Sequence, residues 1–142
     1  MFLVVIILLF LVTFPEKAIP MFPSSIASII QGLHTSAVGG GTSYASVFHL
    51  ISSYKEVYDR IILISDEQSW VYNTKEAFSH YKKVTGCNPK IFTIDMAGHA
   101  YLQFPEQNCY ELAGFSDKIF DLMHQLETDP KAMIHAVESV EL

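Results

Sequence analysis

The chain has 142 residues, of which half are hydrophobic and 17% are charged, with a formal net charge of -6 and a pI near 5.4. This composition excludes a disordered polyelectrolyte and predicts one folded domain, because a chain of this length can bury roughly 70% of its unfolded surface. The acidic balance argues against a protein that grips phosphate backbones through a broad basic surface of its own.

Cysteine and histidine usage gives no metal or disulfide pattern. Cys87 and Cys109 fit no CxxC motif, and we expect reduced thiols rather than the dense disulfide framework of a small secreted domain. The histidines are scattered without the close spacing of a zinc site. Zinc is therefore not indicated.

The N-terminal segment Met1 to Phe14 is apolar except for Thr13. It is short for a spanning helix, which needs about 20 apolar residues. A signal peptide is possible on length, but neither its basic start nor its cleavage site is clear here. The β-branched run Val4 to Ile7 favours a buried strand, and hence a cytoplasmic protein. The alternative is an exported or membrane-anchored protein, with membrane contact through Met1 to Phe14, which is not favoured.

The next predicted elements surround a glycine triplet. Lys17 to Pro23 contains two prolines and suits a short edge strand, and Ser24 or Ser25 can cap a helix with a core face of Ile26, Ile29, Ile30 and Leu33. Gly39 to Gly41 interrupts this pattern. A second helix is predicted to begin after Thr42 and Ser43 and to end near Ser53 or Tyr54.

The central part alternates strands and helices. Ile61 to Ile64 predicts a buried strand followed by a polar loop, and Lys90 to Asp95 predicts another. Between them Thr74 to Val84 predicts a helix that Gly86 stops, with a shared inward side made of Ala77, Phe78, Tyr81 and Val84.

The C-terminal part predicts one strand and two helical patterns. Asn108 to Ala113 predicts a final short strand, and Ser116 and Asp117 can cap a helix whose inward residues are Ile119, Phe120, Met123 and Leu126. The pattern after Thr128 is weakly helical, with Met133, Ile134 and Val137. We therefore expect a domain over residues 1–128 and a C-terminal tail over 129–142.

The order of these elements predicts an α/β fold. Strands that alternate with helices through short connections form βαβ units, hence a doubly wound, mostly parallel sheet with helices on both faces. In such a sheet, ligands bind beyond the carboxyl ends of the strands.

Thr42 and Asp66 are candidate metal ligands at that edge. Asp66 follows a predicted strand and Thr42 precedes a predicted helix, so the hydroxyl and the carboxylate can point into one crevice. Such hard oxygen donors suit Mg²⁺, Ca²⁺ or Mn²⁺. The competing interpretation makes Thr42 a helix N-cap and Asp66 an ordinary loop acid. Nucleotide binding is not expected, because the GGGTS segment lacks the lysine of GxxxxGK[ST] and the spacing of GxGxxG.

An enzyme is the less favoured alternative. Asp66, Glu67, Asp95 and His99 all fall near carboxyl ends of predicted strands, and general bases would have to converge on one pocket. No Ser or Cys stands in a recognisable nucleophile elbow, and Asp95 and His99 are expected to be solvated loop residues. We therefore expect no catalytic activity.

An ordered set of segments carries a resemblance to a known family. Four segments in order resemble the von Willebrand factor A (vWA) domain that ends Ro autoantigen (TROVE-module) proteins: Val38 to Ser43, Ile61 to Trp70, Ala77 to Gly86 and Asn88 to Ile91. Leu112 to Phe120 is similar to the last strand and helix of bacterial and phage members. The similarity runs from about residue 4 to 126, and the ordered set is more specific than any single piece.

The resemblance implies a partial metal-ion-dependent adhesion site (MIDAS). The family builds this site from a DxSxS loop, a Thr in a second loop, which Thr42 matches, and an Asp in a third, which Asp66 matches. No DxSxS occurs in this chain, and the first apolar strand corresponds to the family's second. The family's first strand and helix would be missing, as would the helical-repeat module that encircles RNA ends.

The resemblance therefore implies a truncated, noncatalytic binding module with at best weak Mg²⁺ binding. A protein partner would supply an acidic group at the cation-site face, and RNA would be bound only through the missing module. The alternatives are an extracytoplasmic adhesion-type domain or a nonfunctional gene fragment. Loss of a central strand would expose strand edges, unless Met1 to Phe14 or another chain refills the gap.

Overall fold

The computed structural model describes residues 4–8, 27–28, 31, 43–65, 73–96, 98, 107–114 and 116–139. For residues 4–8, 65 and 136–137 it describes the backbone alone. The elements in chain order are β1 (Val4–Leu8), α2 (Tyr44–Tyr54), β2 (Arg60–Ser65), α3 (Thr74–Thr85), β3 (Lys90–Asp95), β4 (Cys109–Ala113), α4 (Lys118–Thr128) and α5 (Ala132–Glu138).

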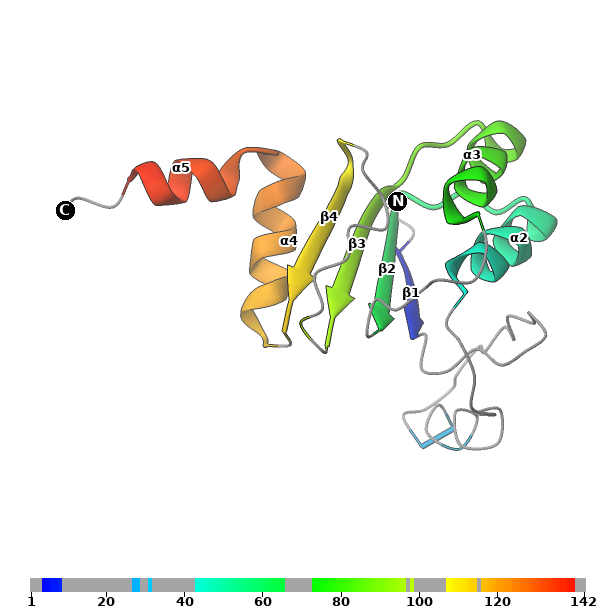
Figure 1. The fold of residues 1–142 in the computed structure, drawn as a ribbon, viewed down its shortest axis with the longest axis horizontal. Helices are drawn as coiled ribbons and strands as arrows, with labels where there is room; N and C mark the ends of the chain where they lie inside the picture. Colours follow the sequence, from blue (N-terminus) through cyan, green and yellow to red (C-terminus); the bar gives the residue numbers. More distant parts are fainter. Residues whose placement is uncertain are drawn as a thin grey trace.

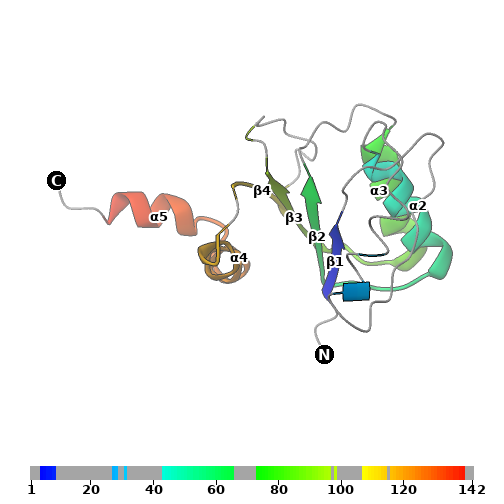
Figure 2. The same ribbon diagram turned by 90° about the horizontal axis from the view of Figure 1, so that it is seen from below.

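The strands form one parallel sheet in the order β1-β2-β3-β4 (Figure 1). Because each strand is added on the same side of the one before it, right-handed crossovers place the intervening helices on a single face. Helices α2 and α3 pack together on that face, and α4, which follows the last strand, lies on the opposite one (Figure 2). The predicted α/β sheet with helices on both faces is confirmed.

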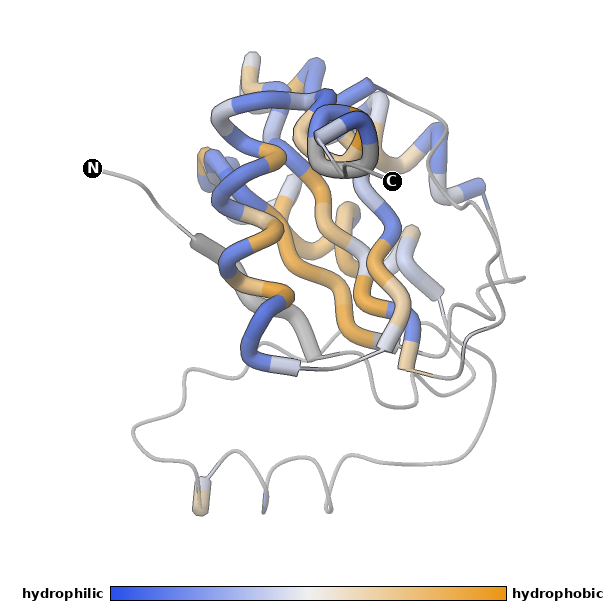
Figure 3. The backbone as a smooth tube through the Cα atoms, turned by 90° about the vertical axis from the view of Figure 1, so that its left-hand side faces the viewer, coloured by the Kyte–Doolittle hydropathy of each residue, from blue (hydrophilic) through white to orange (hydrophobic). Residues whose placement is uncertain are grey.

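Alternate residues of the strands enter two separate cores. Ile61, Leu63 and Ile91 pack with α2 and α3, where the rings of Phe48 and Phe78 have centroids 5.1 Å apart. The intervening residues of β2 and β3 pack with α4 in a second cluster that contains Ile62, Ile64, Phe92 and Ile94. This period of two is the strand pattern, and Figure 3 shows the resulting apolar strands between helices with hydrophilic outer turns.

The predicted N-terminal strand is confirmed at Val4–Leu8. Val4 to Leu8 pair in register with Arg60 to Ile64, so the segment adds a strand beside β2. Within the described residues, no helix is long and apolar enough to cross a bilayer. In the next predicted elements, Ala27, Ser28 and Gln31 are helical, whereas the predicted edge strand Lys17 to Pro23 lies outside the described residues.

Other boundaries agree with the predictions to within a residue or two, but some predicted inward side chains do not. Val84 in the last turn of α3 is 39% exposed and Phe120 in the first turn of α4 is 51% exposed, although both were expected to face the core. A helical pattern gives the direction of a side chain but not how far the packing partner extends, so these two predictions are wrong. Cys87 and Cys109 are thiols, as expected.

The C-terminal tail contains helix α5, which continues away from α4 (Figures 1 and 2). Met133 and Ile134 on this helix are exposed, and Ala132 packs against the core under α4. Asp129 joins the two helices, because its N–H donates to Gln125 O at 2.8 Å and its carbonyl accepts the Ala132 N–H at 3.0 Å.

Candidate cation site at the carboxyl edge of the sheet

The carboxyl edge of the sheet brings together strand ends and helix starts. Helices α2 and α3 run back against the strands, so both begin on the side to which the strand arrows point (Figure 1). We define the carboxyl edge by the last residues of β2, β3 and β4, the first residues of α2 and α3, and the N-cap of α2. In that order these residues are Ser65, Asp95, Ala113, Tyr44, Thr74 and Ser43.

Ser43 is the N-cap of α2. Its backbone is extended, with φ -129° and ψ 102°, and its Oγ accepts the Ser46 N–H at 3.4 Å. The Ser46 hydroxyl in turn donates to the Ser43 carbonyl at 2.8 Å, and Ser43 is buried. The N-cap interpretation of Thr42 is therefore wrong, because the preference of helix starts for a hydroxyl is met one residue later.

The two predicted ligands, Thr42 and Asp66, lie outside the described residues. Each is covalently bonded to a described residue of the carboxyl edge, Thr42 to Ser43 and Asp66 to Ser65. The described neighbours, Ser43 and Ser65, both lie at this edge of the sheet, and the ligand roles of Thr42 and Asp66 stay predictions. Glu67 and His99, the other two candidates for a catalytic role besides Asp66 and Asp95, also lie outside the described residues.

Asp95 is a charged residue of this edge whose burial the sequence did not reveal. It was expected to be a solvated loop residue, but it ends β3 and is 1% exposed. Its Oδ1 accepts the Gly98 N–H at 2.9 Å, and its carbonyl accepts the Gly114 N–H at 2.8 Å. Asp95 therefore accepts hydrogen bonds from the turn after β3 and from the turn after β4. No pattern in the sequence indicates these two contacts.

The two predicted donors are of the type that a hard cation prefers, because a threonine hydroxyl and an aspartate carboxylate would both offer oxygen ligands. The buried Asp95 carboxyl group lies at the same edge, on the strand beside β2. Among the described residues, no three His, Cys, Asp or Glu side chains are grouped as a metal site. A bound cation would therefore depend on Thr42, Asp66 and ligands from elsewhere.

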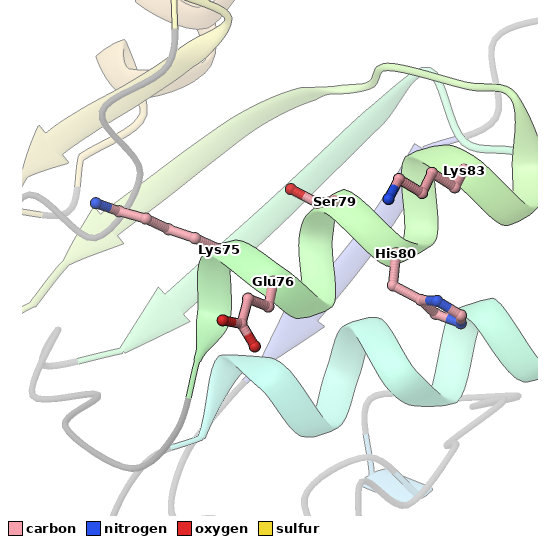
Figure 4. A pocket seen from close by; sticks show the side chains of 5 residues that line it. All are labelled: Lys75, Glu76, Ser79, His80 and Lys83. Atoms are coloured by element: carbon pink, nitrogen blue, oxygen red, sulfur yellow. The ribbon is translucent and has the colours of Figure 1, made fainter.

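A hollow on the outer side of α3 is a weaker candidate. Its lining comes from one helix and consists of Lys75, Glu76, Ser79, His80 and Lys83 (Figure 4). All are exposed and lie opposite the buried Ala77, Phe78 and Tyr81. In Figure 4 the Lys75 and His80 side chains point to different sides of α3, so this hollow is the solvated face of an amphipathic helix.

A parallel sheet with helices on both faces and polar groups at its carboxyl edge defines a Rossmann-like α/β domain. A solved structure with this arrangement is the RO (RSR) protein of Deinococcus radiodurans, which matches with a TM-score of 0.58 and 16% sequence identity. The match covers 72% of this chain and 22% of that protein, so the chain spans about a fifth of its neighbour's length. No family model and no curated protein matches the sequence.

This likeness shows the fold alone, which the chain shares with about a fifth of the Ro protein. The assignment to a vWA domain with an adhesion site, and the ligand roles of Thr42 and Asp66, stay predictions.

Proposed function

We propose that this chain is a noncatalytic binding module of Ro-like (TROVE) type, a vWA domain with a partial metal-ion-dependent adhesion site. Thr42 and Asp66 hold a divalent cation, Mg²⁺ by preference, at the carboxyl edge. An acidic group of a protein partner completes the coordination. The observation that carries the proposal is that β2 ends immediately before Asp66 at the edge where α2 begins, within a fold shared with a Ro protein.

The local structure supports a ligand role for Thr42. Because Ser43 caps α2, the hydroxyl of Thr42 is not required for helix initiation. Two protein oxygens leave a Mg²⁺ ion with most of its waters, so the affinity of the isolated chain is weak. A carboxylate from a partner replaces a water and adds a charge, which makes binding of the partner depend on the cation.

RNA is not bound by these 142 residues themselves. The family's helical-repeat module would carry the RNA of a small noncoding ribonucleoprotein, and the chain itself has a formal net charge of -6. Salt-sensitive binding to phosphates needs many lysine and arginine side chains, whereas this sequence has 9 of them against 15 aspartates and glutamates. A cytoplasmic location goes with this function.

Isothermal titration tests the cation claim directly. Mg²⁺ and Mn²⁺ are titrated into the wild-type chain, Thr42→Ala and Asp66→Ala, with Ser79→Ala on the exposed face of α3 as the matched control. We expect heats for the wild type and Ser79→Ala that are reduced in the two ligand variants. Equal heats in all four proteins would contradict the proposal.

A gel shift tests the RNA part separately. The wild-type chain is mixed with structured small RNAs at low and at physiological salt. We expect no shifted band, because these 142 residues carry a formal net charge of -6. Tight binding that weakens as salt rises would show that the chain carries its own RNA surface and would refute this part of the proposal.

A further inference from the structure

Helix α5 is a short helix that projects from the domain. It has 7 residues and continues away from α4 and the sheet (Figures 1 and 2). Among its described side chains, Ala132 is the one that packs against the core under α4, whereas Met133 and Ile134 are 54% and 55% exposed. A helix this short is marginal in water without packing, because few hydrogen bonds offset the loss of chain entropy. A partner that covered its exposed side would therefore stabilise it.

The start of α5 is fixed by Asp129. Its Oδ1 accepts the Lys131 N–H at 2.9 Å, and its carbonyl accepts the Ala132 N–H at 3.0 Å. Its Oδ2 lies 2.6 Å from Nδ1 of His135, one turn into the helix. Acceptors at a helix start satisfy N–H groups that have no partner within the helix. These contacts hold α5 in the direction in which it leaves α4, so its exposed side chains stand on an ordered helix.

The outward side of α5 carries Ile134 between two opposite charges. Successive residues of an α-helix are turned by about 100°, so Ile134 lies roughly opposite Ala132, on the side that faces away from the core under α4. Lys131 and Glu138 come three residues before and four residues after Ile134, and both are exposed. These spacings place all three on one side of the helix. The carbonyl of Lys131 accepts the His135 N–H at 3.0 Å, so Lys131 belongs to the first turn.

This side of α5 is complementary to itself when two copies run antiparallel. In that arrangement Lys131 of each chain lies beside Glu138 of the other, at both ends of a contact between the two Ile134 side chains. A parallel arrangement would instead bring like charges together, which is unfavourable. An antiparallel contact of this kind has a two-fold axis, the commonest symmetry of protein dimers. The charge pattern therefore fits a second copy of the same helix.

We propose that the outward side of α5 binds α5 of a second copy of this chain as an antiparallel two-fold pair. The inference goes beyond the proposed function, because it requires neither the cation nor its ligands. Two helices about 10 Å long bury less than the roughly 1,200 Å² of a standard stable interface, so the dimer is weak and forms at high concentration.

Exchange of the two charges tests the pairing. Lys131→Glu brings carboxylates together across the two-fold axis, and Glu138→Lys brings ammonium groups together. Both substitutions suit the helix dipole, because they add an anion to the first turn or a cation to the last, so α5 should stay folded. An equimolar mixture of the two variants restores both ion pairs in the mixed dimer. Ile134→Ser removes the central apolar contact, and Val57→Ser, at an apolar side chain that is 50% exposed outside α5, is its matched control.

Sedimentation velocity in EDTA measures the association of each protein over about a hundredfold range of concentration, and circular dichroism checks that each is folded. We expect the wild type and Val57→Ser to associate as the concentration rises. Each charge variant alone and Ile134→Ser should associate at least about tenfold more weakly, because like charges or a lost apolar contact then face each other. The mixture of Lys131→Glu and Glu138→Lys should associate as the wild type does.

A wild-type chain that stays monomeric over the whole range would overturn the inference and leave this side of α5 to a partner of another kind. Association that the charge variants retain, that Val57→Ser loses, or that the mixture fails to restore would place the contact elsewhere and would also overturn it. None of these outcomes bears on Mg²⁺ binding, which is measured separately, so the proposed function stands or falls on its own test.

Discussion

The guanidinium of Arg60, the first residue of β2, forms a two-point ion pair with the carboxylate of Glu127 in the last turn of α4. Lys90, the register partner of Arg60, donates from Nζ to the Glu127 carbonyl at 2.5 Å. Cations are favoured at a helix C-terminus, where carbonyls lack partners within the helix. These contacts fasten α4 to the starts of two neighbouring strands.

Glu127→Gln should therefore destabilise the fold by about 1–2 kcal/mol, because it leaves the partly buried Arg60 without an opposite charge. The free energy of unfolding in urea measures the effect. Glu138→Gln, an exposed substitution on α5, is the control and should change stability by less than about 0.5 kcal/mol. Equal stability of the two variants would show that the ion pair contributes nothing.

Tyr81→Phe should cost about 1–3 kcal/mol of stability. The Tyr81 hydroxyl accepts the Tyr58 N–H at 3.2 Å and donates to the Glu56 carbonyl at 3.0 Å, which locks the segment before β2 to α3. The variant keeps the buried ring but leaves both backbone groups without this partner. Tyr54→Phe, at a side chain that is 50% exposed, serves as the comparison in urea unfolding and should be near neutral.

Alkaline pH should lower the free energy of unfolding. Burial raises the pKa of Tyr58 and Tyr81 and of the Cys87 thiol, and the Glu56 carboxylate adds to the rise at Tyr58. The stabilisation from a raised pKa is complete below the unfolded value, roughly 8.5 for Cys and 10 for Tyr, and is lost as the pH rises through the folded value.

Urea unfolding at intervals from about pH 8 to about pH 11 checks this sign, and stability should fall across that range. Tyr81→Phe should flatten the profile, because it removes one of the groups that titrate. A profile that is level, or that rises with pH, would be inconsistent with the raised pKa values.

Gly86→Ala should destabilise the chain by about 1 kcal/mol. Gly86 ends α3 with φ 69°, a left-handed conformation, and its N–H donates to the Lys82 carbonyl at 2.9 Å. An added Cβ would meet no atom within 4 Å, so the cost is conformational rather than steric crowding. Gly86→Asn should cost less, since Asn tolerates this conformation, and thermal unfolding of both variants tests that order.

Ser43→Ala should lower the stability of the chain, whereas Thr42→Ala should lower its Mg²⁺ binding. Loss of the Ser43 cap should lower stability by about 1 kcal/mol, because the Ser46 N–H loses its side-chain acceptor. Thr42→Ala should leave stability within about 0.5 kcal/mol and reduce Mg²⁺ binding. Thermal unfolding in EDTA and calorimetry compare the two, and a larger stability loss in Thr42→Ala would return the capping role to that residue.

The order and type of the central elements followed from the sequence alone. The apolar run Ile61 to Ile64 and the run Ile91 to Ile94 predicted buried strands because a sheet covered on both faces has no polar side. Gly86 predicted the end of α3 because it adopts the left-handed conformation at low cost. These patterns are local in the sequence, so they predict an element without knowledge of the elements that pack against it.

Only the tertiary structure decided what depends on contacts distant in sequence. It paired Val4–Leu8 with β2, left Phe120 exposed and buried Asp95. Local periodicity does not predict which strands pair, how far a packing surface extends or which path a following loop takes. The sequence predicted a hydroxyl at the start of the second helix, and the fold decided that Ser43 caps it. The fold also decided that Asp95 is buried and accepts the Gly98 N–H, since both depend on three-dimensional hydrogen bonding.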